Sequence, residues 1–151
     1  RLVSRSSRNV FVENCNMDSP NLDRALRFKT NARRGGTIEN IYMRNVTVGR
    51  VAEAVLTIDL LYEEGATGDH PPVVRNVVMD NITSSASPRL MFVRGFPGAV
   101  IDGIRISNST FRGVETSEVL SGTGSVHFEN VTISPAVQVR SLNSMTPVTA
   151  P

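Results

Sequence analysis

The sequence has one cysteine, one lysine and no tryptophan in 151 residues. The single cysteine, Cys15, excludes an internal disulfide framework and a metal cluster built on several cysteines. Charged residues make up 20% and hydrophobic residues 40% of the chain, and no apolar run has membrane-spanning length. We therefore expect a folded domain that does not cross a membrane. The net charge of +2 is too small to predict a nucleic-acid partner.

Several motifs of catalysis and cofactor binding are also missing. The sequence contains no glycine-rich phosphate loop, no His-Glu-x-x-His pair and no Gly-x-Ser-x-Gly turn. The acidic loop at 63–72 does not have the spacing of a calcium-binding loop, and we interpret it as a solvated insertion. We predict no cofactor and no metal site.

A repeated six-residue pattern is the most informative feature that is present. Its form is Asn, apolar, any residue, apolar, polar, Asn, and it occurs fully or in large part at 9–14, 40–45, 76–81, 103–108 and 125–130. The period of two predicts strands whose apolar positions, such as Ile41 and Met43, face the core. The connecting segments are rich in turn formers and lack a 3.6-residue apolar stripe, so we expect no helices between the strands.

This repeat predicts an all-β fold. One strand per coil in a common register, with loops of variable length, is typical of a parallel β-helix whose coils stack about 4.8 Å apart. A second short strand is expected in most coils. We expect one domain with about five coils, followed by a tail at 140–151; the coils lie near 9–30, 40–60, 76–94, 103–121 and 125–139.

The last Asn of each unit forms a column that has two interpretations. Asn tolerates left-handed backbone and can hydrogen-bond to its neighbours, so stacked Asn residues could form a ladder at one corner of the coils. Four of them also satisfy the N-glycosylation pattern: Asn45, Asn81, Asn108 and Asn130. We favour the ladder because these positions follow the repeat, which a modification signal has no reason to do.

The segment around Arg27 and Lys29 is the first candidate site. Alternation puts Leu26 and Phe28 inside and sends both cations outward, about 6.5 Å apart along the strand. Arg can hold a carboxylate with two hydrogen bonds and Lys adds a compact charge, which together suit an acidic sugar. Charged outward positions are common on any strand, so the pattern alone leaves this open. Tyr62, at the end of the corresponding strand one coil later, is either a sugar-stacking residue or a packing residue.

The Asn repeat, the segment Asn14–Met17, the tripeptide Arg27–Lys29 and the run Gly36–Val46 resemble the C-terminal half of polygalacturonases, glycoside hydrolases of family 28. The resemblance implies a right-handed parallel β-helix and a secreted or periplasmic enzyme that hydrolyses pectin with inversion. In that family an Arg-Ile-Lys tripeptide binds a substrate carboxylate and a Tyr on the next coil completes the subsite. The resemblance thus implies Arg27, Lys29 and Tyr62 as substrate-binding residues for polygalacturonate or pectin oligosaccharides.

The catalytic residues of that family have no counterpart in this chain. The sequence has no Asn-Thr-Asp, no Asp-Asp pair and no His followed by Gly. Inverting hydrolysis needs one carboxylic acid for the leaving oxygen and one carboxylate to activate water. We therefore expect a C-terminal portion of a longer β-helix, with no catalytic residue of its own, inactive alone and stacked on N-terminal coils of the same parent chain.

Two other functions remain open on the sequence. A non-catalytic β-helix, such as an adhesin or a tail-spike segment, would use the same surface to bind polysaccharide or simply to stack. A rhamnogalacturonan or xylogalacturonan hydrolase of the same family would differ in substrate.

Overall fold

The computed structural model describes residues 5–136, and these residues form strands, turns and loops without a helix. The long strands form one sheet in the order β1 (Ser7–Met17), β3 (Thr37–Arg50), β5 (Val73–Ala86), β7 (Val100–Val114) and β9 (Val126–Pro135). The short strands form a second sheet in the order β2 (Arg24–Lys29), β4 (Ala54–Asp59), β6 (Arg89–Arg94) and β8 (Val119–Ser121). Every pair of neighbouring strands is parallel.

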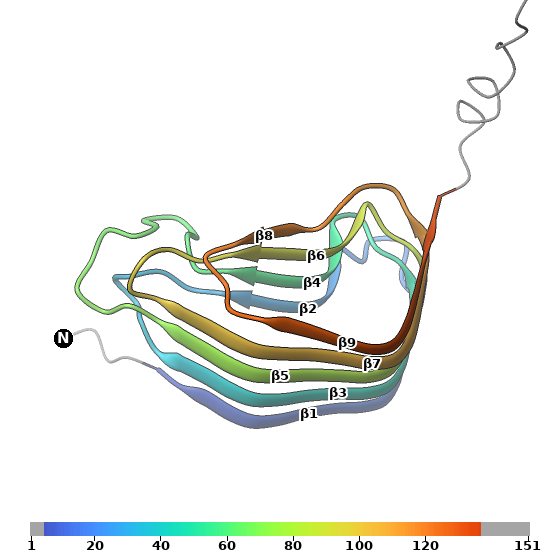
Figure 1. The fold of residues 1–151 in the computed structure, drawn as a ribbon, viewed down its shortest axis with the longest axis horizontal. Coiled ribbons are helices and arrows are strands. Elements are labelled where there is room, and N and C mark those ends of the chain that lie inside the picture. The colour runs from blue at the N-terminus through green and yellow to red at the C-terminus, as the bar shows by residue number, and fades with distance from the viewer. Residues whose placement is uncertain (1–4, 137–151) are drawn as a thin grey trace, which may run out of the picture.

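Each of the first four coils runs along a long strand, bends, and returns along a short strand on the opposite side (Figure 1). Equivalent residues of successive coils lie in register, since Ile41 pairs with Val77 and Val77 pairs with Ile104. Parallel strands joined in this way are right-handed in nearly all proteins. The fold is a right-handed parallel β-helix, which confirms the prediction. None of the residues in the described range belongs to a helix capable of spanning a membrane.

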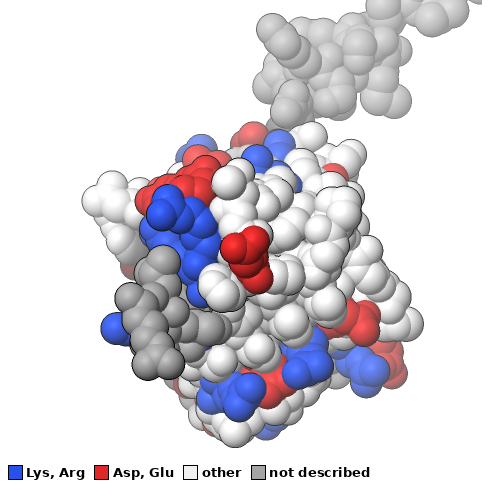
Figure 2. All heavy atoms as spheres, turned by 90° about the vertical axis from the view of Figure 1, so that its left-hand side faces the viewer, with Lys and Arg blue, Asp and Glu red and all other residues white. Residues whose placement is uncertain are grey.

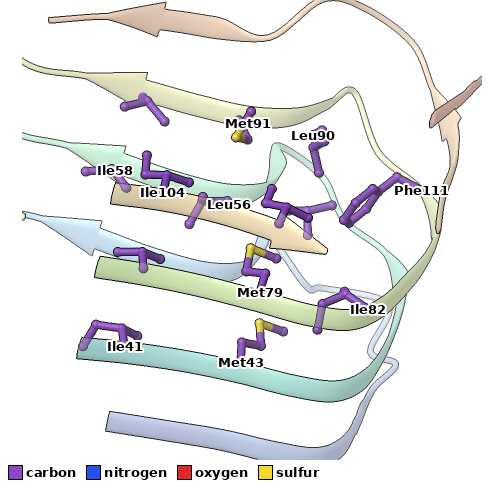
Figure 3. Packing of buried hydrophobic residues seen from close by; sticks show 14 of the residues in the cluster. Ile41, Met43, Leu56, Ile58, Met79, Ile82, Leu90, Met91, Ile104 and Phe111 are labelled. Atoms are coloured by element: carbon purple, nitrogen blue, oxygen red, sulfur yellow. The ribbon is translucent and has the colours of Figure 1, made fainter. Parts of the chain in front are cut away.

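The core lies between the two sheets and is filled by stacked aliphatic and Met side chains (Figure 3). Met43 of a long strand and Leu56 of a short strand are completely buried. The inward positions are those that the period of two predicts. The end coils are more open, with Val10 at 40% and Phe128 at 46% exposure, because each has a neighbouring coil on one side only within the described residues.

Asn residues make the bends in the long strands. Eight of the nine non-glycine residues with positive φ in the described range are Asn of the repeat: Asn9, Asn14, Asn40, Asn45, Asn76, Asn81, Asn108 and Asn130. Their side chains hydrogen-bond from coil to coil. Asn45 Nδ2 donates to Asn14 Oδ1 at 3.0 Å, and Asn81 Nδ2 donates to Asn45 Oδ1 at 2.9 Å. The predicted ladder is therefore confirmed.

The structure adds a second ladder, at the first Asn of each unit, which the sequence analysis had not identified. Asn40 Nδ2 donates to Asn9 Oδ1 at 3.0 Å and Asn76 Nδ2 to Asn40 Oδ1 at 2.8 Å. In the next coil Gly103 takes this place with a φ of 67°. A Cβ there would lie 3.2 Å from the backbone nitrogen of Asn76, so glycine provides both the left-handed backbone and the space.

The short strands β2, β4 and β6 agree with the second segments expected in the first three coils. In the fourth coil the structure adds β8, a second segment that the sequence analysis did not predict. Residues 137–139 of the predicted last coil and the predicted tail at 140–151 lie outside the described residues.

Candidate functional site

The outer face of β2 carries the two cations that the alternation predicts. Leu26 and Phe28 pack against the core, while Arg27 and Lys29 are exposed. Parallel pairing with β4 places Lys29 next to Asp59 across the sheet. Because residues in register on neighbouring strands share a face, the outer faces of β2 and β4 form one surface.

Tyr62 lies against the ammonium group of Lys29. Lys29 Nζ donates a hydrogen bond to Tyr62 Oη at 3.4 Å and lies 4.5 Å from the centre of the ring. The Tyr62 backbone N–H donates to the carbonyl of Thr30 at 3.3 Å, which fixes the loop after β4 on the end of β2. The guanidinium of Arg34 also lies over this ring, at 5.7 Å. The structure thus brings Lys29 and Tyr62 into direct contact and adds Arg34 beside them.

Asp59 could have neutralised Lys29, but it is held by Arg94 of the next coil. Arg94 Nη2 lies 2.9 and 3.0 Å from the two carboxylate oxygens, and its Nε lies 3.1 Å from Oδ1. Oδ1 also accepts the Leu61 backbone N–H at 3.1 Å, which shapes the turn that leads to Tyr62. Among residues 5–136, no carboxylate forms an ion pair with Arg27 or with Lys29. Both cations are therefore available to an anionic ligand.

The acidic loop after β4 is exposed but firmly attached. Asn31, which is completely buried, donates through Nδ2 to the Tyr62 carbonyl at 2.9 Å and to Glu64 Oε2 at 2.6 Å. Arg34 pairs with Glu63 and Arg33 pairs with Glu64. These contacts hold the loop that carries Tyr62 in one position relative to Lys29.

The electrostatic environment of Glu64 is consistent with its contacts to arginines. The pKa of the Glu64 carboxyl is lowered, first because it accepts its own backbone N–H, and further by Arg33, Arg34 and Asn31. Within the described residues, no group of three or more His, Cys, Asp or Glu side chains could hold a metal ion. Glu63 and Glu64 of this loop serve as partners of arginines.

A pocket of about 370 Å³ adjoins Lys29 and Arg34. Thr30, Arg5 and Ser7 also line it. Figure 2 views the side of the molecule at which β2, β4 and β6 end, and it shows basic side chains gathered beside acidic ones there. Three cationic residues, Arg5, Lys29 and Arg34, line this pocket and offer an attractive environment to a small anionic group.

Comparisons with known proteins identify the family. The model of the glycosyl hydrolases family 28 matches residues 3–132, and the chain belongs to this family. Among solved structures, the chain is similar to a hyperthermoactive exopolygalacturonase from Thermotoga maritima, with 31% sequence identity and a TM-score of 0.69. The match covers 84% of this chain and 27% of that protein, so the chain spans about a quarter of its length. A search of curated proteins found no match.

Part of this site was predicted from the sequence. Arg27 and Lys29 face outward as expected, and Tyr62 contacts Lys29. The role of these residues in binding stays a prediction. Arg34 and Arg94 were not predicted. The opposite charges of Arg33-Arg34 and Glu63-Glu64 were the one indication that these two segments pair. The sequence does not show that the loop at 63–72 folds back over β2.

Proposed function

We propose that the chain is the substrate-binding part of a glycoside hydrolase that cleaves α-1,4-galacturonosyl linkages in pectin. Arg27 and Lys29 neutralise the carboxylate of one galacturonate, and Tyr62 holds Lys29 and orients the sugar. The observation that carries the proposal is a pair of neighbouring outward cations without carboxylate partners among the described residues. Family membership and the similarity to an exopolygalacturonase support the choice of substrate.

In this proposal the substrate-binding residues and the catalytic residues lie in two different parts of a longer protein. Inverting hydrolysis requires two carboxyl groups about 6.5–9.5 Å apart across the scissile bond. The Asp-Asp and Asn-Thr-Asp motifs of this chemistry are absent from the sequence. N-terminal coils of the same parent chain supply them, and the parent works outside the cytoplasm, in a secreted or periplasmic form.

Binding of an acidic oligosaccharide to the 151-residue chain tests this proposal. We expect calorimetry to show binding of tri-galacturonate but not of the uncharged galactose trimer. Lys29→Ala and Arg27→Ala should each weaken binding about tenfold, since each removes a charge-assisted hydrogen bond. Arg105→Ala is the matched control, because Arg105 is exposed on β7 in the other sheet. Equal affinity of the Lys29→Ala variant and the unmodified chain would contradict the proposal.

The missing aspartates also favour a second candidate, a β-helix that binds acidic polysaccharide without cleaving it. The two candidates predict the same binding by the isolated chain. The full-length parent separates them: an enzyme releases reducing sugar from polygalacturonate, whereas a binding protein releases none.

A further inference from the structure

A second pocket lies on the outer surface of the short-strand sheet. It has a volume of about 160 Å³ and is lined by Arg24 of β2, Glu53 and Thr57 from β4 and its preceding turn, and Arg89 and Phe92 of β6. This volume is several times that needed for one water molecule. None of these residues lines the pocket next to Lys29, so the two pockets are separate features of one surface.

Strand register places this pocket directly beside Arg27. Arg27 pairs with Thr57, and Thr57 pairs with Phe92, so the three lie in one row across the sheet. Neighbouring parallel strands are about 4.8 Å apart, and Lys29 lies about 6.5 Å further along β2. Arg27 therefore lies between the second pocket and the contact of Lys29 with Tyr62.

Two polar atoms at this pocket lack partners in the part of the chain that the structure describes. The Oγ1 of Thr57 and the Nε of Arg24 are both buried without a hydrogen bond. Thr57 as a whole is only 3% exposed. An unsatisfied buried donor is costly, and such groups in native proteins normally have a partner. Both atoms can donate, so the group that would satisfy them is an acceptor.

The charges at the pocket favour an anionic acceptor. Arg24 and Arg89 supply two positive charges, and Glu53 supplies one negative charge. Arg24 has a carboxylate neighbour in Asp23, but at 3.8 Å and with the Asp23 side chain 68% exposed, this pair is weak. Arg89 forms no ion pair with any residue in the range 5–136. The balance within the pocket is therefore positive.

The remaining lining suits a sugar ring. Phe92 is partly exposed beside the cations and provides an apolar surface of the kind on which the C–H face of a pyranose packs. The Glu53 carboxylate can accept a sugar hydroxyl, while Arg can hold a carboxylate through a pair of hydrogen bonds. This combination of groups matches an acidic sugar better than a simple inorganic anion, because phosphate or sulfate would use neither Phe92 nor Glu53.

We propose that this pocket is a second uronate subsite, in which Arg24 and Thr57 hold the carboxylate of the sugar next to the one bound by Arg27 and Lys29. Arg89 adds a second positive charge, Phe92 supports the ring and Glu53 accepts a hydroxyl. The inference rests on the proposed function, since it assigns a neighbouring unit of the same polymer. It predicts that affinity rises with the length of the oligogalacturonate through contacts made by Arg24 of β2 and by β4 and β6.

A chain-length series tests the subsite. Calorimetry would measure binding of mono-, di- and tri-galacturonate to the unmodified chain and to Thr57→Val, Arg24→Gln and Arg105→Gln. We expect the unmodified chain and the Arg105→Gln control to gain affinity with length. Thr57→Val and Arg24→Gln should lose about tenfold of that gain. Their affinity for the shortest oligogalacturonate that binds should equal that of the unmodified chain.

Thr57→Val also separates a binding role from a structural one. Valine keeps the shape of threonine and removes an unsatisfied hydroxyl, so the melting temperature should stay the same or rise while affinity for the trimer falls. If both variants fold and keep the full gain with length, the second subsite is wrong while the site at Lys29 stands. If the unmodified chain binds no oligogalacturonate, the proposed function and this inference both fail.

Discussion

The ammonium of Lys29 lies 4.5 Å from the centre of the Tyr62 ring and 3.4 Å from its hydroxyl oxygen, although 33 residues separate them in the chain. Stacking of coils is what makes such a contact possible, because it places consecutive coils about 4.8 Å apart. Tyr62 positions the lysine and leaves its charge intact. A carboxylate in the same place would neutralise that charge.

Two substitutions of Tyr62 separate its ring from its hydroxyl. Tyr62→Phe keeps the ring over Lys29 and loses one hydrogen bond, so we expect tri-galacturonate to bind about two- to tenfold more weakly. Tyr62→Ala removes both interactions and should cost more, about tenfold or greater. Calorimetry measures both. If Tyr62→Ala binds as tightly as the unmodified chain, Tyr62 has only a packing role.

The Asn ladder gives a stability prediction with two matched controls. Asn45 has a φ of 53° and bonds to Asn14 and Asn81. Asn45→Ala loses these bonds and forces alanine into left-handed backbone, which should lower the free energy of unfolding by about 2–4 kcal/mol. Asn45→Gly loses the bonds but tolerates the backbone, so its cost should be about 1–2 kcal/mol smaller.

Thr47→Val is the control for the glycosylation alternative. It destroys the Asn45-Val46-Thr47 acceptor pattern while Asn45 keeps its ladder bonds. Denaturant unfolding should give Thr47→Val nearly the stability of the unmodified chain. Equal stability losses in Thr47→Val and Asn45→Ala, with protein from a glycosylating host, would show that a glycan and not the ladder stabilises this corner.

Much of the architecture could be predicted from local pattern. The period of two identifies strands and the inward positions, and Asn at a fixed place in each unit indicates the bend because few other residues tolerate positive φ. Arg27 and Lys29 face outward because side chains alternate between the two faces of a strand and Leu26 and Phe28 face the core. These features depend on residues that are close in sequence or that repeat.

Contacts between different coils were harder to predict. Arg94 reaches Asp59 and Thr57 lies between Arg27 and Phe92 because of the register of β2, β4 and β6, which depends on the lengths of the intervening loops. Those lengths vary from coil to coil. The second pocket is likewise a product of three strands, so no single segment of the sequence indicates it.

Acidic pH should destabilise the folded state of the chain. The pKa of Glu39 is lowered, mainly because it accepts a hydrogen bond from Arg75, with further help from Arg75 and Arg8 charges. The pKa of Asp80 is lowered mainly by the Ser107 hydroxyl. A lowered pKa in the folded state means that the unfolded state binds more protons. The stabilisation is therefore complete above the ordinary pKa values, 4.5 for Glu39 and 3.8 for Asp80, and is lost as the pH falls through the folded values.

Thermal unfolding measured from pH 7 down to pH 3 checks this dependence. We expect the melting temperature of the unmodified chain to fall below about pH 4.5, and the fall to be smaller in Glu39→Gln. Glu115→Gln is the control, because Glu115 is exposed and forms no ion pair within residues 5–136. Identical pH profiles for Glu39→Gln and the unmodified chain would show that the Arg8–Glu39–Arg75 contacts contribute nothing.

The isolated chain should have no hydrolase activity. General acid and base carboxylates are both required for inversion, and the sequence lacks the motifs that provide them. A reducing-sugar assay on polygalacturonate should give the rate of the buffer blank at any pH. Hydrolase activity that copurifies with the chain and is lost in Lys29→Ala would show that catalytic groups lie within these 151 residues.

The most direct test of the whole account is a crystal structure of the chain with tri-galacturonate. We predict a sugar carboxylate within hydrogen-bonding distance of both Arg27 and Lys29, with Tyr62 next to the same ring and the adjoining unit over Thr57 and Phe92. An ordered trisaccharide bound elsewhere, with Arg27 and Lys29 facing only solvent, would contradict the claim that this surface recognises acidic sugars.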